Sequence, residues 1–186
     1  VVEVTDVKTI EGNSFNIDSI IDKLLVSENN KKSKFINKDF NLILKIEKIY
    51  LDKSNIINDL EGFLSFNKNE ISELILESKF SNQKKIKFTI KNNGKEKITT
   101  LFSQEAKPLV ARYKFIKGFD KGDLDFHSIK KNGITNSTLK IDNFKIQEIP
   151  VLAKLLTLAS LQGIADLLTG EGIRFTDFEM KFSNKD

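Results

Sequence analysis

Apolar and polar residues alternate with a period of two along most of the chain. Between residues 85 and 91, Ile86, Phe88 and Ile90 alternate with lysine and threonine, which is the pattern of a strand with one buried and one solvated face. Asn92-Asn93-Gly94 then supplies residues that tolerate positive φ, so residues 84–102 are predicted to form a hairpin. Similar patterns predict further strands at residues 1–10, 40–52, 57–67, 71–81, 123–129, 134–147 and 172–182.

Short clusters of glycine, asparagine and charged residues separate most of these predicted strands. They are Glu11-Gly12-Asn13, Asn67-Lys68-Asn69, Lys121-Gly122-Asp123 and Asn132-Gly133. Short links between successive strands favour an antiparallel meander. No linker rich in glycine, proline or serine interrupts the pattern, so we expect residues 1–186 to form a single domain.

Three of the predicted strands share an interruption of the two-residue period. Their apolar residues follow the spacing i, i+2, i+5, i+7, and they are Leu44, Ile46, Ile49 and Leu51; Leu139, Ile141, Phe144 and Ile146; and Ile173, Phe175, Phe178 and Met180. A one-residue slip sends later side chains to the opposite face unless a β-bulge absorbs it, and a bulge bends the strand. The pattern therefore favours a long curved antiparallel sheet, a groove or half-barrel, over a flat sheet buried on both faces.

Three segments have helical rather than strand patterns, and they are residues 20–25, 104–115 and 150–169. Ser103 is a possible N-cap for the second, but Pro108 leaves open whether that helix starts at residue 104 or at residue 108. The third begins at Pro150, ends before Gly170 and carries only two charges, Lys154 and Asp166. A helix this apolar either plugs the end of a curved sheet or contacts lipid. We therefore predict a β-dominated α+β fold with a C-terminal apolar helix and one or two shorter helices.

The composition is that of a folded domain. The chain has 186 residues, of which 39% are hydrophobic and 30% charged, and it has no cysteine. A chain of this size buries enough surface to fold without disulfides or metal ions. It contains neither a run of about 18 uncharged apolar residues nor a signal-peptide leader, so we expect no membrane span within it. Because the sequence begins with Val1 rather than methionine, we expect it to be part of a longer protein.

The net charge of +4 is weak evidence for a nucleic-acid partner. Arginine, which makes bidentate contacts with phosphate and guanine, occurs only at Arg112 and Arg174. Seven lysines do gather around the predicted hairpin, and they are Lys79, Lys84, Lys85, Lys87, Lys91, Lys95 and Lys97. Such a cluster is either a solvated strand face or a surface for anionic headgroups or nucleic acid. Phe88 alternates away from Lys87, which disfavours base stacking beside the lysines, so we expect no nucleic acid.

The sequence contains few candidate catalytic residues. The single histidine, His127, shares a strand face with Asp125. Without a second histidine, a cysteine or a cluster of carboxylates, the pair completes neither a zinc site nor a nucleophile triad. Gly170-Glu171-Gly172 is a turn rather than a phosphate loop, because no Gly-Lys-Ser/Thr follows it. We predict no catalytic residue, no metal site and no cofactor.

The C-terminal third of the chain resembles the AsmA-like C-terminal region of YhdP-type proteins in the AsmA/TamB superfamily. The shared pattern is a strand ending near a proline, a Leu-Ala-x-Leu-Leu helix, an Ala-Ser-Leu-x-Gly step and a Gly-x-Gly-Ile-x-Phe strand start. In this sequence these are Leu139 to Ile146 with Pro150, Leu152 to Leu156, Ala159 to Gly163, and Gly170 to Phe175. The resemblance covers residues 137–182, with a fitting helix and glycines upstream, whereas residues 1–100 match only in general style.

The resemblance implies a non-enzymatic protein of the Gram-negative envelope. The full-length protein would be tethered to the inner membrane by a segment outside this chain, with its body in the periplasm. Its apolar β-groove would carry phospholipid acyl chains between the inner and outer membranes. The alternative is a structural or assembly module of the envelope without lipid carriage. The residues that we expect to line the groove are Phe144, Ile146, Leu155, Leu158, Phe175 and Phe178.

Overall fold

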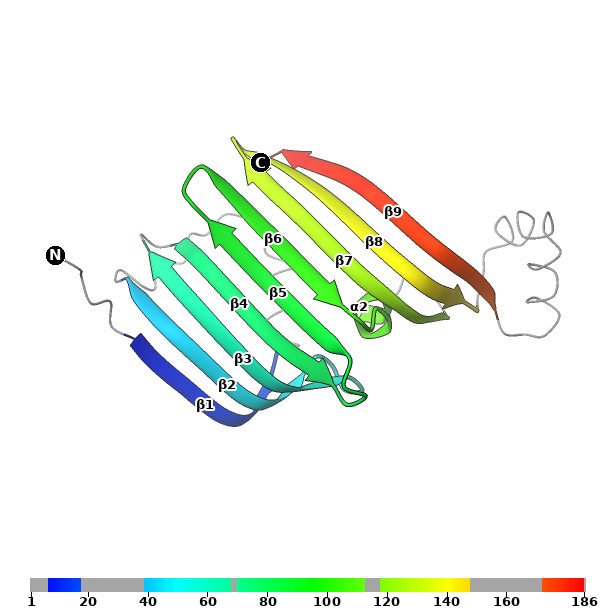
Figure 1. Ribbon diagram of the computed structural model, residues 1–186, viewed down its shortest axis with the longest axis horizontal. Coiled ribbons are helices and arrows are strands. Elements are labelled where there is room, and N and C mark those ends of the chain that lie inside the picture. Colours follow the sequence, from blue (N-terminus) through cyan, green and yellow to red (C-terminus); the bar gives the residue numbers. More distant parts are fainter. Residues whose placement is uncertain (1–6, 18–38, 68–69, 113–117, 148–171, 186) are drawn as a thin grey trace.

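The computed structural model describes residues 7–17, 39–67, 70–112, 118–147 and 172–185. Nine strands form one curved sheet in which they follow one another in sequence order from β1 to β9 (Figure 1). The strands are β1 (Val7–Asn16), β2 (Phe40–Tyr50), β3 (Ile56–Asn67), β4 (Glu70–Phe80), β5 (Lys85–Asn92), β6 (Glu96–Ser103), β7 (Phe119–Lys131), β8 (Ile134–Ile146) and β9 (Ile173–Lys185). One short helix, α2 (Lys107–Arg112), lies between β6 and β7 in the chain. The predicted β-dominated fold with a long curved sheet is confirmed.

The first strand departs from the predicted antiparallel meander. Neighbouring strands pair antiparallel from β2 to β9, but β1 pairs with β2 in parallel. The turn predicted at Glu11-Gly12-Asn13 is wrong, because β1 continues through it and Gly12 faces Ile46 of β2. Parallel strands need a long connection rather than a tight turn. The connection from β1 to β2 comes after Asn16, so no turn is needed at Glu11-Gly12-Asn13.

Two of the predicted turns are confirmed. Asn92-Asn93-Gly94 joins β5 to β6, with Gly94 at a φ of 81° and the Asn93 N–H donating to the carbonyl of Glu96 over 3.2 Å. Asn132 and Gly133 join β7 to β8 with φ values of 52° and 74°. Consecutive residues at positive φ give the turn a twist that matches the two strands of a hairpin.

The turn predicted at Lys121-Gly122-Asp123 is wrong, because all three residues lie inside β7. Lys121 and Gly122 have positive φ values of 63° and 85°, and Gly122 lies opposite Asn143 of β8, where φ is 55°. The pairing of β8 with β9 keeps one register on both sides of Asn143. The slip in the period of β8 is thus absorbed by a residue at positive φ rather than by the extra residue of a bulge. Register shifts do occur between β3 and β4.

The apolar core lies at one end of the sheet, where α2 contacts β7. One buried cluster contains Ala106, Val110, Phe119, Leu124, Ile141 and Phe144, and a second contains Ile49, Leu51, Ile57, Phe80 and Ile86. Leu101 of β6 and Leu109 of α2 pack against both clusters. The N–H of Ala106 donates to the carbonyl of Gly122 over 2.7 Å, which fixes the segment before α2 against the kinked part of β7.

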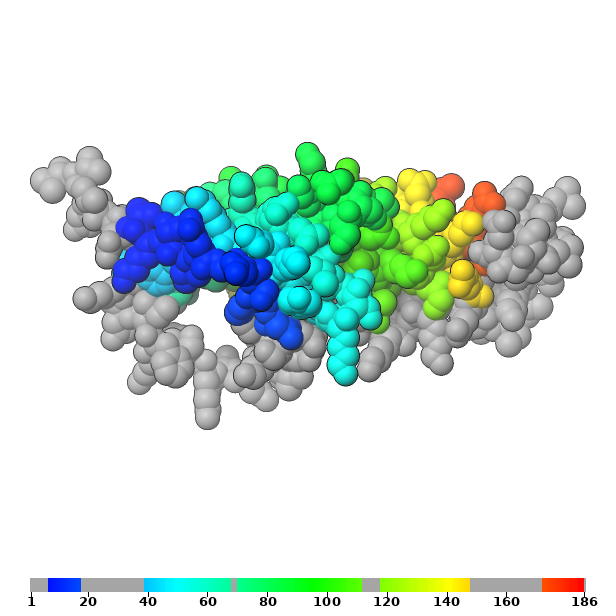
Figure 2. All heavy atoms as spheres, turned by 90° about the horizontal axis from the view of Figure 1, so that it is seen from below, coloured from blue at the N-terminus to red at the C-terminus, as the bar shows by residue number. Residues whose placement is uncertain are grey.

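The helix predicted within residues 104–115 begins at Lys107 in the structure, next to the later of the two expected starts. Ser103 is not its N-cap, because the Ser103 hydroxyl bonds to the backbone of Glu105. The predicted helices at residues 20–25 and 150–169 lie outside the described residues. Within the described part of the chain, no helix is long and apolar enough to cross a membrane. Seen from below, the strands succeed one another along the molecule from β1 to β9 (Figure 2).

Candidate functional site

The pairing of the nine strands aligns one apolar position from each strand into a single row across the sheet. Its members are Ile10, Leu44, Gly62, Leu76, Phe88, Leu101, Phe126, Leu139 and Met180. We call this set the apolar row and the side of the sheet that it occupies the apolar face. Directly paired residues of a sheet point to the same side. The row is therefore a continuous apolar band, which extends beyond the region that α2 and its cluster occupy.

The apolar row remains accessible along much of its length. Leu44, Leu76 and Phe88 in the interior strands are half-buried, and Ile10 at the β1 edge is 50% exposed. At the other edge, Phe178, Met180 and Phe182 of β9 are 42%, 43% and 44% exposed. Isolated exposed apolar side chains are common on protein surfaces, but a contiguous band of them marks an interaction site. The apolar face is therefore the candidate functional site.

The residues expected to line a groove are divided between the core and the edge. Phe144 is only 5% exposed, and its ring stacks between those of Phe119 and Phe175. Ile146 and Phe175 are half-buried and pack against the same cluster. The structure therefore brings three of the expected residues together, but within the core beside α2. Phe178 lies apart on β9 and is exposed, while Leu155 and Leu158 lie outside the described residues.

Sequence reasoning missed the interior members of the apolar row. Leu44, Leu76 and Leu101 all sit in alternating patterns that predicted their strands correctly. The pattern shows that each residue faces the apolar side of its own strand. It does not show that the three occupy the same row, because that depends on the register between strands.

The opposite side of the sheet, which we call the polar face, carries a matching row in which every member except Phe102 is charged. Its members are Glu11, Lys45, Glu61, Glu77, Lys87, Phe102, Asp125, Lys140 and Glu179. Several neighbours form ion pairs, among them Lys45 with Glu11 at 3.4 Å and Lys140 with Glu179 at 3.3 Å. We call this set the charged row. It makes this part of the polar face charged, although Ile43, Phe63 and Ile75 pair in the neighbouring row of the same face.

Three lysines of β5 lie on the polar face, and the charge of the lysine cluster is partly neutralised. Lys85, Lys87 and Lys91 are exposed, and β5 is an inner strand rather than an edge. Carboxylates from other segments pair with several of the lysines. These ion pairs are Lys79 with Asp59, Lys84 with Glu105 and Lys87 with Glu77. Pairing with residues distant in the sequence reduces the positive potential that the local sequence suggests.

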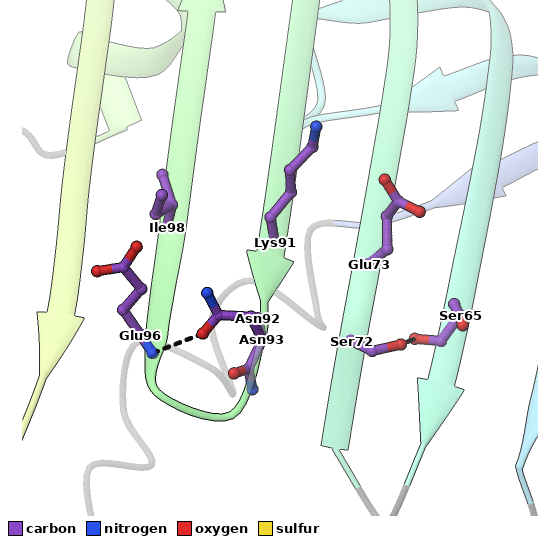
Figure 3. A pocket seen from close by; sticks show the side chains of 8 residues that line it. All are labelled: Ser65, Ser72, Glu73, Lys91, Asn92, Asn93, Glu96 and Ile98. Atoms are coloured by element: carbon purple, nitrogen blue, oxygen red, sulfur yellow. Dashed lines mark hydrogen bonds between the residues drawn. The ribbon is translucent and has the colours of Figure 1, made fainter.

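A shallow polar depression of about 420 Å³ lies beside the turn between β5 and β6 (Figure 3). Its lining residues are Ser65, Ser72, Glu73, Lys91, Asn92, Asn93, Glu96 and Ile98. The Ser72 hydroxyl donates to the carbonyl of Ser65 over 3.1 Å, and the Glu96 N–H donates to the Asn93 side chain over 2.9 Å. Two carboxylates and one ammonium group surround it, so its net charge is −1.

Candidate catalytic and metal-binding groups do not converge in the described residues. Asp125 and His127 are both exposed on the polar face of β7. No group of three or more histidine, cysteine, aspartate or glutamate side chains in the described ranges is arranged to hold a metal ion.

Comparison with known proteins adds no relative to this description. No protein-family model matches the chain, and neither a curated protein nor a solved structure matches it.

Proposed function

We propose that the apolar face binds phospholipid acyl chains and that the protein acts without catalysis, as a lipid-carrying part of an envelope protein. The observation that carries this proposal is the apolar row, to which all nine strands contribute and which remains accessible at both edges. In this proposal the curved sheet forms one wall of a groove. The resemblance of residues 137–182 to the AsmA-like region supports a location in the periplasm, tethered to the inner membrane, and transport of phospholipid between the two membranes.

The dimensions of the row suit an acyl chain. Strands are about 4.8 Å apart in the hydrogen-bonding direction, so nine strands span roughly 38 Å. An acyl chain crosses half of a hydrocarbon core that is about 30 Å thick, so it is shorter than the row. Each buried methylene contributes about 0.8 kcal/mol, so contact along part of a chain gives useful affinity without a specific polar partner. Such a surface distinguishes poorly among lipids.

The test compares two neighbouring residues of β4 that point to opposite faces. Leu76 belongs to the apolar row, Ile75 faces the polar side, and both are half-buried. Purified protein is extracted with organic solvent, and phospholipid is quantified by mass spectrometry. We expect lipid with the wild type and with Ile75→Glu, and several-fold less with Leu76→Glu, because a carboxylate in the band is costly to desolvate. Circular dichroism must show that both variants are folded.

The alternative is a structural or assembly module without lipid. It is favoured by the cluster beside α2, where Phe144 and Ile141 are buried and closed to ligands. This alternative predicts that the wild type yields no phospholipid. It also predicts that the two glutamate variants behave alike in extraction, because neither face would carry a lipid. Either result would count against the lipid proposal.

A further inference from the structure

Strand β9 is the last strand of the described sheet. Within the described residues, β9 pairs only with β8. Residues 176–185 are all exposed, and β9 contains no proline. An edge strand of this length offers backbone donors and acceptors to a further strand, and proteins usually block such edges or pair them. The side chains of β9 therefore indicate what the edge pairs with.

The sequence of β9 is self-complementary about Met180. Glu179 and Lys181 flank Met180 on the polar face, and Phe178 and Phe182 lie two residues away on the apolar face. Consider two antiparallel copies of β9 related by a two-fold axis at Met180. Residue 179 then faces residue 181 of the other copy, and residue 178 faces residue 182. Both opposite-charge and aromatic cross-strand pairs are stabilising.

We propose that the β9 edge is a homodimer interface, in which two copies of this chain pair antiparallel about Met180 and join their sheets into one. The two-fold axis is perpendicular to the sheet, so the apolar faces of both copies lie on the same side. Such an interface is isologous, because the same strand contributes both halves. The proposal does not depend on lipid binding.

The apolar row continues across this interface, and the charged row gains one further charged position. The apolar row ends at Leu139 and Met180, and it would continue through Met180 and Leu139 of the second copy. The charged row ends at Lys140 and Glu179, and the next position would be Lys181 of the second copy. The charges would then alternate in sign from strand to strand. Hydrogen bonds from Lys181 and Lys140 hold the pKa of the Glu179 carboxyl below its usual range, so this carboxylate is ionised at neutral pH.

The other edge of the sheet does not offer this complementarity. On β1, Lys8 and Glu11 are three residues apart, so they point to opposite faces and cannot face each other across two antiparallel strands. Glu179 and Lys181 are two residues apart and share a face. The charge pattern therefore favours antiparallel pairing of two copies of β9 over pairing of two copies of β1.

Single cysteines test the register directly, because the chain contains no cysteine. Directly opposed residues of antiparallel strands have Cα atoms about 4.5 to 5.5 Å apart, within the range of a disulfide. Met180→Cys should therefore form a disulfide-linked dimer under mild oxidation. Phe178→Cys is the matched control, since it has the same face and exposure but lies opposite Phe182 of the second copy. The double variant Phe178→Cys/Phe182→Cys should restore cross-linking.

Each result of the cysteine test decides the proposal. Cross-linking of Met180→Cys and of the double variant, with little for Phe178→Cys alone, supports pairing about Met180. Equal cross-linking of both single variants would indicate random collision and would overturn the proposal. Absence of cross-linking for Met180→Cys would overturn it as well.

Charge reversal gives an independent test by analytical ultracentrifugation. Glu179→Lys or Lys181→Glu places like charges opposite each other twice in the dimer, so each should raise the dimer Kd about tenfold. The double variant Glu179→Lys/Lys181→Glu re-creates both opposite-charge pairs and should return the Kd to within about threefold of the wild-type value. Glu11→Lys on β1 is the control and should leave the Kd unchanged. A monomeric wild type, or a double variant as weak as the single ones, would refute the interface.

Discussion

The rings of Phe144 and Phe175 stack across β8 and β9, with centroids 5.0 Å apart and planes inclined by 8°. Phe119 of β7 stacks on the other side of Phe144 at 5.2 Å. Phe144 is therefore the middle ring of a three-strand stack in the cluster that α2 covers. This stack joins the last three strands of the sheet beside the kink at Asn143.

Removal of the middle ring should be costly. We expect Phe144→Ala to lower the free energy of unfolding by about 3 to 5 kcal/mol, because it leaves a cavity and breaks both stacks. Phe178→Ala on the exposed edge is the matched control and should cost less than about 1 kcal/mol. Urea unfolding followed by circular dichroism measures both values. Similar losses for the two variants would show that Phe144 is not a core residue.

Gly122 should not tolerate a side chain. Its φ is 85°, and an added Cβ would lie 3.0 Å from the Cβ of Phe144 and 3.3 Å from the carbonyl oxygen of Asp142. We expect Gly122→Ala to destabilise the protein by about 2 to 4 kcal/mol through backbone strain and crowding.

Gly94 provides the control for this variant. It also has a positive φ, 81°, but an added Cβ would meet nothing within 4 Å. Gly94→Ala should therefore cost only the backbone term of about 1 to 2 kcal/mol. Urea unfolding midpoints compare the two variants, and equal losses would mean that β7 and β8 do not approach closely at Gly122.

The ion pair between α2 and β7 should make stability depend on pH in acid. Lys107 donates a hydrogen bond to Asp120 over 2.8 Å, which holds the pKa of the Asp120 carboxyl below its ordinary value of 3.8. A carboxyl with a lowered folded-state pKa stabilises the fold at neutral pH. That stabilisation is lost as the pH falls below 3.8 and through the folded-state pKa.

Asp120→Asn should therefore lower the free energy of unfolding at neutral pH by up to about 1 kcal/mol, because the pair is largely solvated. The difference from the wild type should shrink as the pH falls below 3.8 and through the lowered folded-state pKa of Asp120. Lys107→Gln should behave in the same way, and the double variant should lose no more than either single one. If the free energies of unfolding of variant and wild type differed by the same amount at all pH values, the Lys107–Asp120 pair would not be the source of the pH dependence.

The lysines of the hairpin should contribute little to the fold. Lys85, Lys87 and Lys91 are exposed on the polar face. Replacing all three with glutamine should change the free energy of unfolding by less than about 1 kcal/mol, because exposed charges are screened by water. Sedimentation with anionic vesicles should give the same bound fraction before and after the substitutions. A marked loss of vesicle binding would instead identify this face as a membrane contact.

Local sequence was sufficient to place most strands. The strand predicted at residues 134–147 is β8, Ile134–Ile146, and the predicted hairpin is β5 and β6. Side chains of a strand alternate between two faces whatever lies beside it, so the pattern is readable without knowledge of its neighbours. The turns at Gly94 and Gly133 were equally readable, because both residues have a positive φ, which glycine tolerates.

Where the prediction was wrong, the deciding contact came from a distant part of the chain. Lys121-Gly122-Asp123 has the composition of a turn, yet pairing with β8 keeps it inside β7. Gly12 belongs to a strand rather than a turn because β1 pairs with β2 in parallel. Local composition cannot distinguish a glycine in a turn from a glycine where two strands approach closely.

The sequence by itself determined where most strands lie and, in strands such as β5, which face is apolar. Only the tertiary structure decided that Leu44, Leu76 and Met180 lie in one row and that Phe144 lies in the core while Phe178 lies at an edge. The physical reason is that alternation depends on one strand alone, whereas rows depend on register. Register is set by the hydrogen-bond ladder between strands, and a shift of one residue would move every side chain of a strand to the other face.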